Sequence, residues 1–227
     1  MPKSEIQDFN QDILAYEGSI RKKDFYDDYY TRIANVNAKT VMELGCASGD
    51  FLHHMPQQFI GYGVDKSAEL IKIANETRKK INLTFICDDV LSPDFSQVAD
   101  VVVMTGFLTS FMQFELILEK SINAANKLVL INDFMNPFGV DARFTMRNSK
   151  FFPKEFQTVY TIWSTSTLSE HLDHLGVKYQ FIPYVMKSHL NEFLEPVRNF
   201  HAILDGDKVL INRAGMILYG YNIIIEK

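Results

Sequence analysis

A short segment of small and acidic residues at positions 41–50 has the composition of a loop that brings the backbone close to a small ligand. An apolar run ends at Glu43, turns through small residues and continues into an apolar pair that is typical of a helix start. Gly45 and Gly49 supply backbone freedom and carry no Cβ atom, so a ligand can approach them closely. The acid two residues before the first glycine then decides which charge that ligand should carry.

The carboxylate of Glu43 argues against a dinucleotide and favours a cofactor with positive charge. A dinucleotide loop with the pattern G-x-G-x-x-G accepts a pyrophosphate on backbone N–H groups at a helix N-terminus, where a carboxylate would repel it. S-adenosylmethionine carries a sulfonium and an ammonium group and no phosphate, so it is the expected cofactor. An NAD-dependent oxidoreductase is the alternative, and both Glu43 and the missing G-x-G-x-x-G pattern count against it.

The segment resembles the first motif of the class I S-adenosylmethionine-dependent methyltransferases, E/D-x-G-x-G-x-G, with Ala47 in place of the middle glycine. An alanine is compatible with this motif if its φ is negative. Three further segments fall where the family would need them, each at the end of an apolar run: Asp65, Asp88-Asp89-Val90 and Thr105-Gly106.

The resemblance implies a role for each of these positions. Asp65 would accept hydrogen bonds from both ribose hydroxyls, as in the dinucleotide folds. Asp89 and Val90 would lie beside the adenine ring, and the end of the fourth strand would face the transferred methyl group. The residues that the resemblance places at the cofactor are Glu43, Gly45, Cys46, Ala47, Ser48, Gly49, Asp65, Lys66, Asp88, Asp89, Val90, Thr105 and Gly106. The expected product is S-adenosylhomocysteine.

Alternating apolar runs and amphipathic segments predict the sheet that positions these loops. Strands are expected at 40–44, 60–64, 83–86, 101–104, 127–132, 179–185 and 216–226. Helices are expected at 21–35, after the glycine loop, at 67–79 with Ser67 as the N-cap, and at 111–125 and 167–175. Runs that are apolar on both faces and separated by helices indicate a parallel sheet covered on both sides, whose ligand-binding loops meet at the carboxyl edge.

The expected fold is therefore α/β: a doubly wound, seven-stranded, mostly parallel sheet with an antiparallel last strand, as in the Rossmann-like methyltransferases. One domain is expected over residues 1–227, with a helical cap at 1–38, a cofactor-binding half at 39–135 and a substrate-side half at 136–227. The Asp-Gly-Asp sequence at 205–207, between apolar runs, predicts a hairpin. A capping box that starts at Ser4 predicts a helix near the N-terminus.

Methyl transfer needs a nucleophile, a methyl carbon and a sulfur in line, and a base only where the nucleophile carries a proton. Alignment alone can be worth ~7–11 kcal/mol. Asp133, just past the fifth predicted strand, is the candidate general base or substrate anchor, and the alternative is an acid that caps the following turn. Tyr29, Tyr30 and Phe107 are candidate walls of the methyl site, because ring faces attract a sulfonium; ordinary core packing is the alternative.

Two arginines are candidate anchors for an anionic acceptor. If residues 141–148 form a helix, Arg143 and Arg147 lie one turn apart and could bind a phosphate or a carboxylate; a solvated charged face is the alternative. Asn132-Asp133 resembles the acid–amide pair of metal-dependent catechol-type methyltransferases. Two oxygen ligands from one dipeptide are too few for a dedicated cation site, so no metal is expected.

A fainter resemblance concerns the acceptor. Residues 131–141 with Arg147, and the late hairpin followed by the strand at 215–226, resemble bacterial methyltransferases linked to surface-polysaccharide synthesis. This likeness implies a sugar hydroxyl as the nucleophile. An N-methyltransferase of another small molecule and a non-catalytic protein that binds S-adenosylmethionine are the alternatives.

Composition indicates the kind of partner. The chain has 227 residues, 47% of them hydrophobic, and a net charge of −5, which allows a sizeable core without the basic footprint of a nucleic-acid-binding surface. Two cysteines cannot form a disulfide framework, and no run approaches the ~20 apolar residues of a membrane span. We expect a cytoplasmic enzyme, monomeric or homodimeric, that acts on a small molecule, has no nucleic-acid partner and does not span a membrane.

Overall fold

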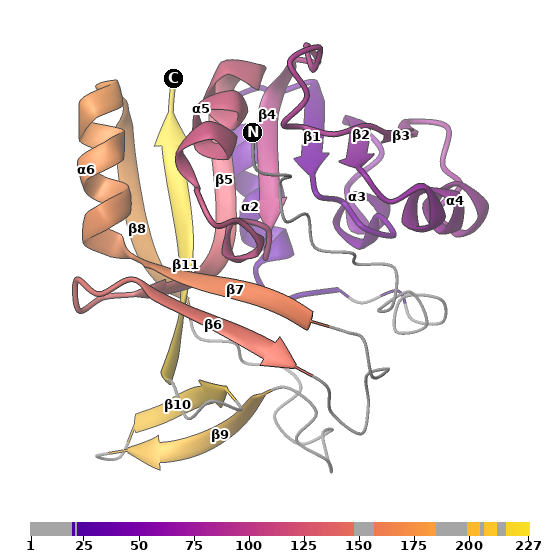
Figure 1. The fold of residues 1–227 in the computed structure, drawn as a ribbon. Helices are drawn as coiled ribbons and strands as arrows, with labels where there is room; N and C mark the ends of the chain where they lie inside the picture. Colours follow the sequence, from indigo (N-terminus) through magenta and orange to yellow (C-terminus); the bar gives the residue numbers. More distant parts are fainter. Residues whose placement is uncertain (1–19, 21, 148–156, 185–198, 205–206, 213–216) are drawn as a thin grey trace.

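The computed structural model describes residues 20, 22–147, 157–184, 199–204, 207–212 and 217–227. Its central sheet has the strand order β3-β2-β1-β4-β5-β11-β8 (Figure 1). These strands are β1 Thr40–Leu44, β2 Ile60–Asp65, β3 Leu83–Cys87, β4 Ala99–Thr105, β5 Ala125–Asn136, β8 Lys178–Tyr184 and β11 Ile217–Glu226. The first five are parallel, and β11 pairs antiparallel with both β5 and β8. The predicted seven-stranded sheet with an antiparallel last strand is confirmed.

Helices cover both faces of this sheet. They are α2 Tyr26–Asn35, α3 Asp50–His54, α4 Ala68–Thr77, α5 Glu115–Ala124 and α6 Thr165–Leu175, with a 3₁₀ turn, η2, at Leu108–Ser110. Neighbouring strand residues such as Val41 and Met42 belong to different core clusters, one packed with α2, α3 and α4 and the other with α5 and α6. Successive side chains of a strand point to opposite faces, so the uniformly apolar strands follow from burial on both sides.

Two predicted boundaries are corrected. The helix expected at 111–125 begins only at Glu115, because Phe111 has an extended backbone after the η2 turn and Phe114 is the N-cap of α5. The fifth strand continues to Asn136, so Asp133 lies within β5 and not past its end. The cause is pairing: Asp133 and Met135 are paired with Tyr221 and Tyr219 of β11, which extends the strand beyond its parallel neighbour β4.

The helix considered for residues 141–148 is wrong. Residues Ala142–Arg147 form strand β6, which pairs antiparallel with β7, Gln157–Ser164. Ala142, Phe144 and Met146 alternate with polar residues, a period-two pattern that is typical of a strand. The Cα atoms of Arg143 and Arg147 are therefore about 13 Å apart along an extended strand, instead of one helical turn.

A second hairpin follows late in the chain. Strands β9 Asn199–Leu204 and β10 Asp207–Asn212 are antiparallel, as the Asp-Gly-Asp sequence predicted, and β10 pairs in turn with β11. The helix predicted from Ser4 lies outside the described residues. Figure 1 shows both hairpins on the side of the sheet toward which β1 and β2 point, so four strands beyond the predicted seven flank the carboxyl edge. No helix in the described part of the chain is long and apolar enough to span a membrane.

Candidate functional site

The loop between β1 and α3 runs through the left-handed region of backbone conformation. Gly45 has φ +70°, Ala47 has φ +47° and Gly49 has φ +82°. The condition that an alanine at position 47 keeps a negative φ is not met. A left-handed alanine costs roughly 1–2 kcal/mol, and the backbone N–H of Ala47 donates a hydrogen bond of 2.9 Å to Asp65 Oδ2 that holds it there.

Aromatic rings explain why this loop needs glycine. A Cβ atom on Gly45 would lie 2.3 Å from the ring of Phe107, and one on Gly49 would lie 2.4 Å from the ring of Phe85. Both rings therefore pack against the backbone at these glycines, where a Cβ atom would not fit. Phe107, which also contacts Phe111 edge to face at 4.8 Å between ring centroids, therefore lies against the loop; its role as a wall of the methyl site stays a prediction.

Glu43 is the buried acid at the base of the loop. Only 2% of its surface is exposed, its Oε1 accepts a hydrogen bond of 3.2 Å from Thr105 Oγ1, and its buried Oε2 has no partner among the described residues. Burial raises the pKa of this carboxyl to about 8, against the opposing effects of Lys23 and Thr105. A buried acceptor without a donor is costly, and an ammonium group of a ligand would satisfy it.

Lys23 belongs to the same electrostatic environment, and the sequence analysis missed it. Burial lowers the pKa of its ammonium group, while attraction to Glu43, Asp133 and Asp50 raises it. Three carboxylates thus act together on one cation at the entrance to α2. No sequence signal marked Lys23 as a site residue, because it stands among other charged residues in a segment without a motif. The site is negative in character, which suits a positively charged ligand.

Asp65 joins the loops that follow β1 and β2. Its Oδ2 accepts from the backbone of Ala47, and its Oδ1 accepts from the backbone of Ser67, both at 2.9 Å. Each carboxylate oxygen has two lone pairs, so capacity for the hydroxyl groups of a ribose is left. Ser67 itself caps α4, as predicted, by accepting from the N–H of Leu70. Lys66, between Asp65 and Ser67, continues this loop.

The segment after β3 is held beside Asp65 by backbone pairing. The N–H of Asp88 donates to the carbonyl of Asp65 at 3.1 Å. Asp89 is exposed and its Oδ1 accepts from the N–H of Leu91 at 2.9 Å, whereas Val90 is 4% exposed and packs in the core. Contact of Asp89 and Val90 with adenine stays a prediction.

The end of β4 offers space next to Glu43. Gly106 has φ +65°, its N–H donates to the carbonyl of Asn132 at 2.7 Å, and a Cβ atom there would have no heavy atom within 4 Å among the described residues. Thr105, the preceding residue, is the hydrogen-bond donor to Glu43. The structure therefore brings together Glu43, Thr105 and Gly106 with the loop residues Gly45 to Gly49. Among the latter, Cys46 is 4% and Ser48 2% exposed.

Asp133 lies at the same edge, on the neighbouring strand. It is 3% exposed, its Oδ2 accepts from the N–H of Thr109 at 3.2 Å, and its Oδ1 accepts from the N–H of Phe134 at 2.9 Å. Burial raises the pKa of the carboxyl to about 6, against these hydrogen bonds. The carboxylate holds the η2 turn that follows β4, so it does cap a turn, but not the one after its own strand.

The other predicted substrate residues are held elsewhere. The Tyr29 hydroxyl donates to Asn222 Oδ1 at 3.2 Å, and the Tyr30 hydroxyl donates to the carbonyl of Phe51 at 2.6 Å, so both tyrosines tie α2 to the core. Arg143 donates to the carbonyl of Met112 at 2.9 Å, and the side chain of Arg147 lies outside the described residues. The described part of the chain contains no group of three or more His, Cys, Asp and Glu side chains suited to a metal; absence of a metal stays a prediction.

Comparison with known proteins identifies the family. A family model described as a methyltransferase domain matches residues 35–180, which is more than half of the chain. The chain belongs to this family, and it is a class I S-adenosylmethionine-dependent methyltransferase with the Rossmann-like fold of that class. A search of the curated proteins gives no match.

Solved structures show the same fold at low identity. A putative S-adenosylmethionine-dependent methyltransferase from Listeria monocytogenes is 11% identical, with a TM-score of 0.61, covering 89% of this chain and 98% of that one. One from Methanosarcina mazei is 16% identical, with a TM-score of 0.59, covering 86% and 96%. Magnesium protoporphyrin IX methyltransferase from Synechocystis, with bound S-adenosylmethionine, is 11% identical, with a TM-score of 0.52, covering 94% and 81%.

The burial of Glu43 predicts a specific pH dependence of stability. Its folded-state pKa of about 8 exceeds the ordinary 4.5. The folded protein therefore keeps a proton that the unfolded chain has released, and the contribution is complete at low pH and lost as the pH rises toward 8. Between pH 6 and 8, the free energy of unfolding should fall by up to about 1.4 kcal/mol per pH unit in the wild type relative to Glu43→Gln.

Urea unfolding of the ligand-free protein measures this difference. Glu69→Gln, which removes an exposed carboxylate in the first turn of α4, is the matched control and should follow the wild type. If the free energy of unfolding of Glu43→Gln and of the wild type changed in parallel with pH, the assignment of a protonated, buried Glu43 would be contradicted.

Proposed function

We propose that this methyltransferase transfers the methyl group of S-adenosylmethionine to a hydroxyl group of a small molecule, with a sugar hydroxyl as the acceptor. The observation that carries the cofactor site is the unpartnered, buried Oε2 of Glu43 at the base of the loop that starts at Gly45. The choice of a hydroxyl acceptor rests on Asp133, a buried carboxylate whose pKa of about 6 suits proton removal near neutral pH. The sequence resemblance of residues 131–141 supports a sugar.

The residues around the loop would divide the recognition of the cofactor among them. Glu43 would accept a hydrogen bond from its ammonium group, Asp65 would accept from the ribose hydroxyls, and Asp89 and Val90 would flank the adenine. When bound, S-adenosylmethionine supplies an electrophilic methyl group on a positively charged sulfur. Phe107, whose ring lies on Gly45, would present an aromatic face to that charge and exclude water from it.

Asp133 would complete the transfer by removing a proton. One of its carboxylate oxygens would accept the proton of the acceptor hydroxyl as the new oxygen–carbon bond forms and the methyl–sulfur bond breaks. S-adenosylhomocysteine would be the neutral leaving group, and the proton would leave to solvent after the reaction. The N–H groups of Thr109 and Phe134 fix the orientation of the carboxylate without using all of its lone pairs. In this proposal residues 1–227 form one domain, with residues 39–135 binding the cofactor and residues 136–227 facing the acceptor.

Ligand-induced stabilisation tests the cofactor site. S-adenosylmethionine and S-adenosylhomocysteine, each at a hundred times its dissociation constant, should add about 2.7 kcal/mol of stability. For a chain of this length the unfolding midpoint should rise by roughly 5–10 °C in a thermal scan, and NADH should leave it unchanged. Asp65→Ala should lose most of the shift, whereas Asp94→Ala, an exposed acid after β3, should keep it. A shift with NADH alone, or with none of the three, would refute the site.

The pH dependence of the rate tests the role of Asp133. With a saccharide acceptor identified by screening, kcat/KM of the wild type should rise with pH through about 6, since the base acts only when ionised. Asp133→Asn should lower kcat by about 10²–10⁴-fold. It should also lose the acid limb of the pH profile, which is the rise of kcat/KM with pH around 6.

Asp100→Asn is the matched control, because Asp100 also accepts backbone hydrogen bonds, from Lys39 and Thr40, but at the opposite edge of the sheet. It should lose stability and keep the acid limb. An Asp133→Asn protein that is destabilised but retains kcat and the acid limb would reduce Asp133 to a cap of η2. An amine acceptor turned over by Asp133→Asn at the wild-type rate would favour N-methylation.

A further inference from the structure

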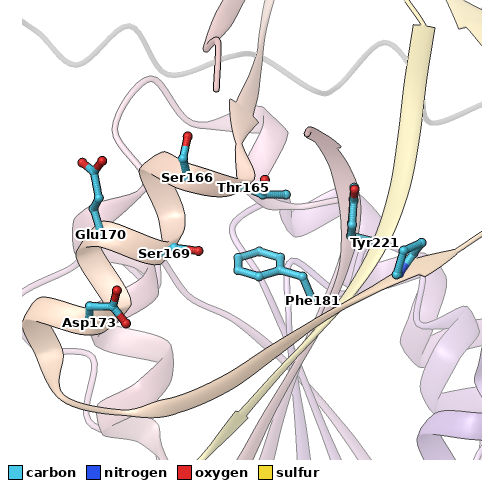
Figure 2. Close-up of a pocket in the computed structure, with 8 residues that line it drawn as sticks. Thr165, Ser166, Ser169, Glu170, Asp173, Phe181 and Tyr221 are labelled. Atoms are coloured by element: carbon cyan, nitrogen blue, oxygen red, sulfur yellow. The ribbon is translucent and has the colours of Figure 1, made fainter. Parts of the chain in front are cut away.

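An open cavity lies away from the glycine loop, between α6 and the strands β8 and β11. It has a volume of about 580 Å³, which lies within the ~300–1,000 Å³ range of small-molecule sites. Figure 2 shows the ring of Phe181 in the middle of this cavity, with the side chains of α6 on one side and Tyr221 on the other. Nothing in the proposed methyl transfer uses this space.

The floor of the cavity is aromatic and its rim is rich in hydroxyl groups. The rings of Phe181 and Tyr221 are in edge-to-face contact, with centroids 6.2 Å apart. The hydroxyls of Thr165, Ser169 and Tyr221 make no hydrogen bond within the part of the chain that the structure describes, so they are available to a ligand. Burial raises the pKa of the Tyr221 hydroxyl, so it acts as a neutral donor and acceptor.

The charges of the rim narrow the ligand class. Glu170 and Asp173 line the cavity and none of its lining residues is basic, which disfavours a phosphate or a carboxylate. Both acids are exposed on the solvent side of α6, whereas Phe181, Tyr221 and Ser169 are half-buried. Solvated carboxylates hold an organic cation weakly, but they accept hydrogen bonds from hydroxyl groups. An aromatic floor below hydroxyl and carboxylate groups therefore suits a neutral polyhydroxylated ring.

The cavity is one strand away from the proposed base. Tyr221 is paired with Asp133 on one side and with Pro183, a lining residue, on the other. Directly paired residues of antiparallel strands have Cα atoms about 4.5–5.5 Å apart and side chains on the same face. Asp133, Tyr221 and Pro183 therefore form a row across one face of the sheet that leads from the base into the cavity.

We propose that the cavity between α6 and β8 binds a neutral saccharide unit of the acceptor, remote from the hydroxyl that is methylated. Its role as an acceptor subsite rests on the proposed function, but saccharide binding to it does not. Phe181 provides the face on which the ring lies, and Tyr221, Ser169 and Glu170 provide hydrogen bonds to its hydroxyl groups.

Titration of the full chain with methyl glycosides of glucose, galactose and mannose, followed by ¹H–¹⁵N NMR, tests this site. Concentrations up to roughly 50 mM cover dissociation constants in the millimolar range. At least one glycoside should shift the resonances of Ser169, Glu170 and Phe181 in a saturable way. The double variant Ser169→Ala/Tyr221→Phe should raise the dissociation constant at least about tenfold, since two hydrogen bonds are lost.

Tyr219→Phe is the matched control, because Tyr219 lies two residues before Tyr221 on the same strand and outside the cavity lining. It should bind the glycoside as the wild type does. The absence of saturable shifts with every glycoside would overturn the proposal, as would unchanged affinity in the double variant or saturable shifts with choline alone. Thermal stabilisation by S-adenosylhomocysteine should be the same in all variants; its absence beside intact glycoside binding would overturn the proposed function and leave this site standing.

Discussion

The buried carboxylate of Glu43 is the constraint on which the rest of the site depends. A parallel sheet places the end of β1 in its centre, where an acid loses its hydration, and only Thr105 of the neighbouring strand compensates one of its oxygens. The free protein therefore carries an unsatisfied acceptor and a pKa of about 8 at the centre of the carboxyl edge. The unpaired oxygen lowers the stability of the free protein. Binding of a cation removes this penalty and is favoured by it, because the same oxygen then accepts a charged hydrogen bond.

The other two acids of this edge, Asp65 and Asp133, accept hydrogen bonds from backbone N–H groups and retain lone pairs for further hydrogen bonds. Asp65 accepts from the N–H groups of the left-handed Ala47 and of Ser67. Asp133 accepts from the N–H groups of Thr109, in the η2 turn, and of Phe134. Both carboxylates thereby set the shape of the loops that would surround a cofactor and an acceptor. In the proposed function, a single sheet edge combines a cation site at Glu43 with a buried base at Asp133, and the row through Tyr221 leads from that base to the cavity between α6 and β8.

The sequence predicted the parts of the fold that rest on local periodicity. All seven strands of the core and the cap at Ser67 were predicted because apolar runs, acids and turn residues follow one another regularly. Strand β6 was mistaken for a possible helix, although its apolar and polar residues alternate with the period of a strand. The left-handed backbone of Ala47 and the position of Lys23 near three carboxylates depend on contacts between distant segments, which spacing alone does not encode. The cavity between α6 and β8 had no sequence signal for the same reason.

Proton release on cofactor binding tests the central role of Glu43 most directly. Isothermal titration of S-adenosylmethionine at pH 6.5, in buffers of different ionisation enthalpy, counts the protons exchanged per bound ligand. With a pKa of about 8 in the free protein, Glu43 should release close to one proton when it pairs with the ammonium group. Glu43→Gln should bind more weakly and lose this release. A binding enthalpy of the wild type that is independent of the buffer would contradict the account.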